Sequence, residues 1–161
     1  MREVTLSSGE TVEVECLSCA ITNGWIEPEG GVVYETDYFH AHQDVAYPVR
    51  GLFIIASKRH IKSFDELTEK ERIDYVNVLA KIRKTQRDTL GIEYVYYFYN
   101  EDTTHHFHTW MVPRYDWMYE FVRSIESVRP VLFHARNNMN HKENMEEVKD
   151  AIDLLKKELN K

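Results

Sequence analysis

The sequence has 161 residues, of which 43% are hydrophobic and 12% aromatic, enough apolar material for one packed core but not for a second full domain. Its formal net charge of −7 disfavours a nonspecific grip on a nucleic-acid backbone, which needs clustered Lys and Arg. Residues 1–15 alternate polar and apolar side chains without a signal-peptide pattern, and no apolar run is long enough to cross a bilayer. We therefore expect a single-domain cytoplasmic protein that binds neither a nucleic-acid polymer nor a membrane.

Strand patterns dominate the first third of the chain. Residues 3–15 read as strand material, and Gly30-Gly31 marks a turn before a short strand at 32–35. Residues 38–44 alternate again, and 52–55 form a compact apolar strand ahead of a polar turn. Most of the sheet is therefore expected in this part of the chain.

A long amphipathic helix follows these strands. Thr68 and Glu71 have the spacing of a capping box at its start, and Leu90-Gly91 is typical of a helix end. The apolar face of this helix is predicted to carry Ile73, Val76, Leu79 and Ala80.

Two more strands and a second helix complete the chain. Residues 93–99 and 106–112 are predicted as neighbouring strands joined by a short polar loop, and 143–159 as a helix. The order strands, helix, strands, helix predicts an α+β domain with an antiparallel sheet rather than a doubly wound parallel one.

The only two cysteines, Cys16 and Cys19, have C-x-x-C spacing. In a chain with no export signal, this pair favours metal binding or redox chemistry over a structural disulfide. Thioredoxin-type redox chemistry expects the motif near a βαβ unit, which the predicted elements lack. The eight histidines keep a metal site in contention, and a pair of reduced thiols without metal is the alternative.

The densest polar cluster is the segment from Thr104 to Arg114. Alternate residues of a strand share a face, so His106, His108 and Trp110 are predicted to project together, with His105 on the opposite face. The alternative is a pair of partly buried histidines that make only structural hydrogen bonds.

Several motifs together resemble the histidine-triad family over residues 16–115. The string His106-x-His108-x-Trp110-Met-Val-Pro-Arg is similar to the family's alternating histidines, although Trp110 stands where the third histidine is usual. Upstream matches, in the order of the branch with cysteines, are Cys16-Leu-Ser-Cys19, Val33-Tyr34-Glu35-Thr-Asp37, Asp44 and the segment Pro48 to His60. Agreement of several motifs in register is more specific than any single one.

The resemblance implies a histidine-triad-like fold, with one five-stranded antiparallel sheet and two main helices, in a homodimer that acts on a small-molecule nucleotide substrate. Residues 1–161 then form one such domain, with a helical C-terminal extension over about 116–161. It also implies a structural Zn²⁺ held by Cys16, Cys19, His60 and His106.

The resemblance further implies that His108 attacks phosphorus and becomes nucleotidylated. A neutral imidazole is a good nucleophile near pH 7, because its reference pKa is about 6.5. Asp44 is expected to accept hydrogen bonds from the ribose, and Asn100 and Thr104 are assigned to substrate binding with it. Glu101 and Asp102 would repel a polyphosphate unless they face away from the site.

The predicted function is hydrolysis of a nucleoside phosphoramidate or a dinucleoside polyphosphate through a nucleotidyl-histidine. Two alternatives stay open. One is a nucleotidyltransferase related to galactose-1-phosphate uridylyltransferase, and the other is a non-catalytic nucleotide-binding or zinc-structured module.

Overall fold

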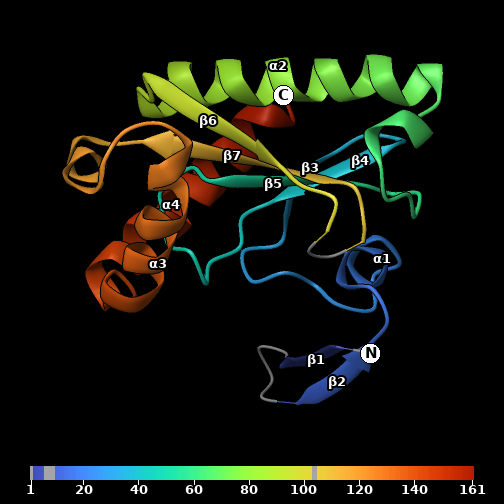
Figure 1. Ribbon diagram of the computed structural model, residues 1–161, viewed down its shortest axis with the longest axis horizontal. Helices are drawn as coiled ribbons and strands as arrows, with labels where there is room; N and C mark the ends of the chain where they lie inside the picture. Colours follow the sequence, from blue (N-terminus) through green and yellow to red (C-terminus); the bar gives the residue numbers. More distant parts are fainter. Residues whose placement is uncertain (1, 6–9, 103–104) are drawn as a thin grey trace.

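A computed structural model describes residues 2–5, 10–102 and 105–161. Its centre is a five-stranded antiparallel sheet with the spatial order β3-β4-β5-β7-β6 (Figure 1). The predicted α+β class and five-stranded antiparallel sheet are confirmed. The strands are β3 (Val32–Glu35), β4 (Phe39–His42), β5 (Phe53–Ser57), β6 (Tyr94–Tyr99) and β7 (His108–Arg114).

The predicted strand region 3–15 forms a separate antiparallel hairpin of β1 (Arg2–Thr5) and β2 (Thr11–Val14). The hairpin lies below the central sheet, next to α1 (Leu17–Thr22) (Figure 1). A small cluster of Ala20, Ile21 and Ile26 connects the two, with Val12 and Val14 packed against it. The N-terminal segment is therefore a small unit with its own apolar contacts.

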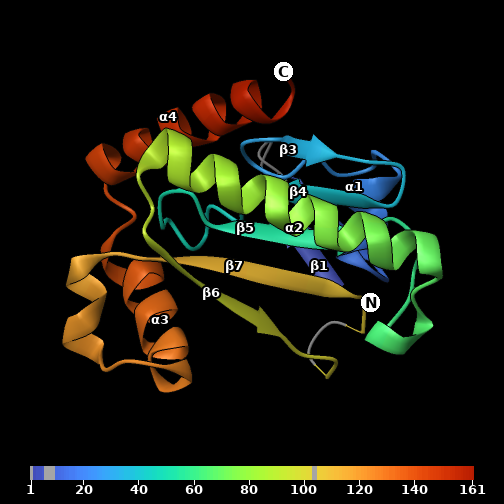
Figure 2. The ribbon, with the colours of Figure 1, turned by 90° about the horizontal axis from the view of Figure 1, so that it is seen from above.

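One face of the sheet is covered by α2 (Glu69–Leu90) and α4 (Lys142–Leu159), which lie side by side above it (Figures 1 and 2). The predicted capping box is present, because the Thr68 hydroxyl accepts from the Glu71 amide at 3.3 Å and Glu71 Oε2 accepts from the Thr68 amide at 2.7 Å. Gly91 ends α2 with a φ of 66°, a left-handed conformation that favours glycine. Both helices therefore begin and end close to the predicted positions.

The predicted apolar face of α2 was wrong for Ile73, Val76 and Ala80, whereas Leu79 packs against the core as predicted. Ile73 and Val76 are 58% and 60% exposed, whereas the residues that face the sheet include Tyr75, Val78 and Ile82. Tyr75 determines this orientation, because its ring packs against Phe39 and Phe107 and its hydroxyl is 2.6 Å from Thr109 Oγ1. A tyrosine buries more apolar area than the aliphatic residues that the pattern counted.

The opposite face of the sheet is covered at two ends (Figure 1). Helix α1 lies at one end, and α3 (Val128–Asn138) lies at the other with the short helices η2 (Asp116–Phe121) and η3 (Ile125–Ser127). The C-terminal part builds a second core there, made of Val49, Leu52, Ile54, Val112, Met118, Val131 and Ala135. Within the described ranges, no helix combines the length and hydrophobicity that a membrane span requires.

Candidate functional site

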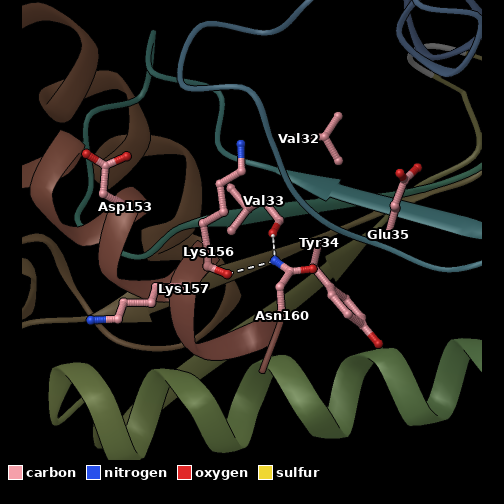
Figure 3. Close-up of a pocket in the computed structure, with 8 residues that line it drawn as sticks. All are labelled: Val32, Val33, Tyr34, Glu35, Asp153, Lys156, Lys157 and Asn160. Carbon is pink, nitrogen blue, oxygen red and sulfur yellow. Dashed lines mark hydrogen bonds between the residues drawn. The ribbon is translucent and has the colours of Figure 1, made fainter.

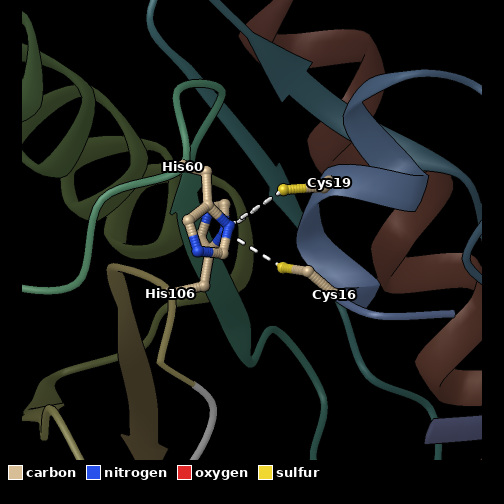
Figure 4. A group of neighbouring side chains, drawn as sticks. All are labelled: Cys16, Cys19, His60 and His106. Atoms are coloured by element: carbon tan, nitrogen blue, oxygen red, sulfur yellow. Dashed lines mark hydrogen bonds between the residues drawn. The ribbon is translucent and has the colours of Figure 1, made fainter. Parts of the chain in front are cut away.

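Four side chains that are distant in sequence meet beside α1 (Figure 4). Cys16 Sγ lies 3.2 Å from His106 Nδ1, and Cys19 Sγ lies 3.1 Å from His60 Nδ1. The two Nδ1 atoms are 3.2 Å apart, and Cys19 Sγ is 3.7 Å from His106 Nδ1. All four ligand atoms lie within 4.8 Å of one another, so the structure brings together the residues predicted as metal ligands.

Three segments position these ligands. Cys16 is the residue before α1 and Cys19 lies in its first turn, while His60 follows β5 and His106 precedes β7. His106 Nε2 donates to the backbone oxygen of Ser57 at 2.8 Å, so the neutral ring carries its lone pair on Nδ1, toward the cysteines. The backbone hydrogen bond therefore orients His106 as a ligand.

The donor set fits a tetrahedral cation. With Zn–S bonds of about 2.3 Å and Zn–N bonds of about 2.0 Å, ligand atoms lie roughly 3.3–3.8 Å apart, close to the separations seen here. Burial, together with the neighbouring Cys16, raises the pKa of the Cys19 thiol to about 11. A divalent cation would favour the thiolate that this environment otherwise disfavours.

His108 begins β7, two residues later than the predicted start of that strand at His106. Its side chain is 8% exposed, and its Nδ1 donates to the backbone oxygen of His106 at 2.8 Å. The proton of the neutral ring is therefore on Nδ1 and the nucleophilic lone pair on Nε2. His106 thus contributes its side chain to the Cys2His2 cluster and its carbonyl to the orientation of His108.

Two further imidazoles share this face of the sheet. The register aligns His40 with Ala56 and His108, and His42 with Ile54 and Trp110. The His40 and His42 rings stack with centroids 5.4 Å apart. Burial lowers the pKa of His40 to about 4 and that of His42 to about 3, so both are neutral at physiological pH. Sequence reasoning did not assign them, although the alternation in Phe-His-Ala-His is the signal that places both on one face.

Trp110 lies on the same face as His108, as predicted, and packs against the C-terminal core. Its ring meets Tyr47 edge-on at a centroid distance of 5.3 Å, and the Arg136 guanidinium lies 4.7 Å from the Tyr47 ring centre. Helix α3 therefore brings a cation beside the loop that carries Asp44.

Of the remaining predicted substrate residues, the structure describes Asp44 and Asn100. Asp44 is partly buried after β4, and its Oδ1 accepts from the amide of Ala46 at 3.0 Å, as in a turn-forming aspartate. Asn100 is partly buried directly after β6, and Thr104 lies outside the described residues.

Glu101 and His105, in the loop before β7, are not placed as the sequence suggested. Glu101 bonds Ser63 Oγ at 2.9 Å and the hydroxyl of Tyr99 at 2.6 Å, and Tyr99 packs against the core under α2. Glu101 therefore points away from His108, which removes one predicted source of repulsion. The parity argument for His105 was wrong, because this residue is exposed, has a φ of 51° and lies outside β7.

A groove of about 580 Å³ lies elsewhere, between β3 and α4 (Figure 3). At its centre Asn160 Nδ2 donates to the backbone oxygens of Val33 at 2.9 Å and Lys156 at 2.7 Å. These bonds connect the end of α4 to the edge strand β3. The polar centre of the groove therefore has a structural role.

Comparison with solved structures identifies the fold. A Zn-bound histidine-triad family protein from Mycobacterium smegmatis is 19% identical, with a TM-score of 0.64 over 90% of this chain and 93% of the other. A hypothetical histidine-triad nucleotide-binding protein from Sulfolobus tokodaii is also 19% identical, with a TM-score of 0.63 over 90% and 92%. A member of the HIT family of proteins from Bacillus subtilis is 21% identical, with a TM-score of 0.60 over 86% and 94%.

No protein-family model and no curated protein matches the sequence. The structural likeness nevertheless extends over nearly the whole chain, including much of the region beyond residue 115 that the sequence motifs do not cover. The resemblance noted in the sequence is confirmed at the level of architecture, and the chain has the fold of histidine-triad proteins.

Proposed function

We propose that this chain is a zinc-stabilised histidine-triad hydrolase, in which His108 attacks the phosphorus of a nucleoside phosphoramidate or a dinucleoside polyphosphate. The observation that carries the proposal is the hydrogen bond from His108 Nδ1 to the His106 carbonyl, which directs the lone pair to Nε2. In catalytic histidines generally, a hydrogen bond from one ring nitrogen to a fixed acceptor keeps the proton there and leaves the lone pair on the other nitrogen.

The proposed reaction has two steps. His108 Nε2 forms a bond to phosphorus while the bond from phosphorus to the leaving group breaks, and the leaving group takes a proton from solvent. Water then attacks phosphorus and loses a proton to solvent, the Nε2–P bond breaks, and a nucleoside monophosphate and neutral His108 are released. Asp44, Asn100 and Thr104 are proposed to hold the nucleotide, and the orientation of Glu101 leaves a polyphosphate leaving group possible.

The test of this mechanism is replacement of His108. The His108→Asn variant is expected to fold and bind adenosine monophosphate, yet to form no covalent adduct with adenosine 5′-phosphoramidate, because it lacks the nucleophile. Intact-protein mass spectrometry after an acid-free quench measures the adduct. His105→Ala, which changes an exposed imidazole outside β7, is the control and should react like the parent. A substantial turnover rate in His108→Asn would refute the mechanism, and nucleotide binding without any adduct in the parent would support the non-catalytic module.

We also propose that Cys16, Cys19, His60 and His106 bind one structural Zn²⁺, which supplies a cross-link between α1 and the start of β7. The support is the near-tetrahedral spacing of the ligand atoms and the hydrogen bond from His106 Nε2 to the Ser57 carbonyl, which orients the His106 ring. Elemental analysis of protein purified without chelators should find about one zinc per chain. Cys16→Ser should lower the melting temperature by roughly 10 °C or more, because metal binding contributes directly to folding.

Ser18→Ala is the matched control for the zinc site, since Ser18 lies between the cysteines and is not among the clustered ligands. This variant should keep its zinc and its melting temperature. Purified protein without zinc, or Cys16→Ser with the parent's stability, would contradict the assignment.

A further inference from the structure

His42 occupies an unusual place on the sheet face that carries His108. The register puts it in line with Ile54 and Trp110, with β5 between its own strand and β7. Trp110 stands where a third imidazole would follow His108 on β7, and an indole offers one donor and no acceptor. The imidazole that β7 lacks therefore has a candidate replacement on β4.

The fold itself makes little use of the polar atoms of this ring. His42 is 6% exposed, and its Nδ1 is buried without a hydrogen-bond partner among the residues that the structure describes. A buried unpaired polar atom destabilises the folded state, so an apolar ring would serve the core better here. An orphaned lone pair is tolerated more readily than an orphaned N–H, so the proton of the neutral ring belongs on Nε2.

The neighbouring His40 holds His42 in place on the sheet face that carries His108. The His40 ring stacks on it with an interplanar angle of 26°, which limits its rotation. His42 and His108 project from the same face of the sheet, with β5 between their two strands. An imidazole with an N–H on Nε2 is thus held on the sheet face that carries the proposed nucleophile.

We propose that the Nε2–H of His42 donates a hydrogen bond to a nonbridging oxygen of the phosphoryl group that His108 attacks. The inference rests on the proposed function of this site and assigns it a catalytic residue on β4. Charge develops on these oxygens as the Nε2–P bond of His108 forms, and a donor fixed in advance stabilises it without reorganisation. A neutral donor achieves this without adding a positive charge that would deactivate the His108 nucleophile.

The contact is tested first in the parent protein, by NMR of ¹⁵N-labelled imidazoles with adenosine monophosphate and adenosine as probes. Adenosine monophosphate is expected to shift the Nε2 and Hε2 resonances of His42, whereas adenosine, which lacks the phosphate, leaves them in place. Equal shifts with both probes would assign His42 to the nucleoside and overturn the inference, as would no shift with adenosine monophosphate.

Substitution then tests the effect on chemistry. His42→Phe, which keeps a ring without a donor, should slow single-turnover adduct formation by roughly 10- to 100-fold with adenosine monophosphate affinity changed less than about threefold. His42→Gln places an amide N–H near the position of Nε2 and should recover much of the rate. His134→Phe is the control, because it changes a partly buried imidazole on α3 that packs against Trp117 and Phe121.

The outcomes separate this inference from the proposed function. If the parent forms no adduct but adenosine monophosphate still shifts His42, the nucleophile assignment fails and the phosphoryl contact stands. If the parent forms the adduct and His42→Phe matches its rate, the role of His42 fails and that of His108 stands. The NMR experiment decides the contact even if His42→Phe does not fold.

Discussion

Asp44 combines a structural and a proposed binding task within one carboxylate. Its Oδ1 accepts from the Ala46 amide, so truncation to alanine would disturb the turn as well as the ligand. Asp44→Asn keeps an oxygen acceptor and removes only the charge. We expect Asp44→Asn to weaken adenosine monophosphate binding by about 10-fold or more, because a charge-assisted hydrogen bond to the ribose would become a neutral one.

Isothermal calorimetry measures this affinity. Asp37→Asn, an exposed aspartate in the turn between β3 and β4, is the matched control and should bind like the parent. Equal affinities of Asp44→Asn and the parent would remove Asp44 from the binding site and leave it only its turn.

Individual residues differ in how far the sequence could place them. The predicted metal ligands follow from the family resemblance, which rests on recognisable markers such as the C-x-x-C pair and the alternating histidines. His42 does not, because its closeness to His108 depends on the pairing of β4 with β5 and of β5 with β7. Those registers are long-range properties that local periodicity cannot reveal.

At the scale of elements, Glu71 connects the start of α2 to the loop that carries His60. Its side chain is 5% exposed and accepts two hydrogen bonds from Arg59, at 2.9 and 2.8 Å, besides capping α2. The hydrogen bonds from Arg59 are the main reason why the pKa of Glu71 falls from its usual value of 4.5 to about 2. The folded state is therefore stabilised by ionised Glu71 above pH 4.5, and this contribution is lost as the pH falls toward 2.

Glu71→Gln should lower the free energy of unfolding by about 1–3 kcal/mol at pH 7, since the amide can still cap α2 but cannot pair with Arg59. The difference from the parent should shrink as the pH falls from 4.5 toward 2. Urea unfolding at several pH values measures it. Glu69→Gln, an exposed residue of the same helical turn, is the control, and a pH-independent difference for Glu71→Gln would contradict the role of the charge.

Elements with a strong local signal were predicted well. The capping box and Gly91 delimit α2, and apolar spacing delimits α4. The orientation of α2 was not predictable from aliphatic spacing, because the Tyr75 contacts to Phe39 and Phe107 depend on the sheet beneath. Helix α3 was expected only as part of a helical extension. Its apolar face is short, and the core that it shares with β5 and β7 depends on long-range packing that local spacing does not reveal.

At the scale of the whole molecule, one edge of the sheet suits self-association. Strand β6 is an edge strand with β7 as its neighbour, and it carries half-exposed Tyr94 and Tyr97. Helix α2 exposes Ile73 and Val76 instead of burying them. Exposed apolar side chains and an unpaired strand edge are features that a second copy can cover, which favours the predicted homodimer.

We expect the parent to sediment as a dimer and Val76→Glu to sediment as a monomer at micromolar concentration, because the new carboxylate would be buried in the interface. Sedimentation velocity measures the masses. Phe133→Glu alters an equally exposed apolar residue on α3 and should remain dimeric. A monomeric parent, or a dimeric Val76→Glu, would place the interface elsewhere or exclude it.

The bond between His108 Nδ1 and the His106 carbonyl has a regiochemical consequence. Histidine can be phosphorylated on either ring nitrogen, and the two isomers differ in chemical stability. A ring nitrogen whose N–H donates a hydrogen bond to a backbone oxygen keeps its proton and has no free lone pair with which to attack an electrophile. An adduct on His108 would therefore be the tele isomer, substituted on the nitrogen farther from the main chain, and its pros counterpart would require this hydrogen bond to break.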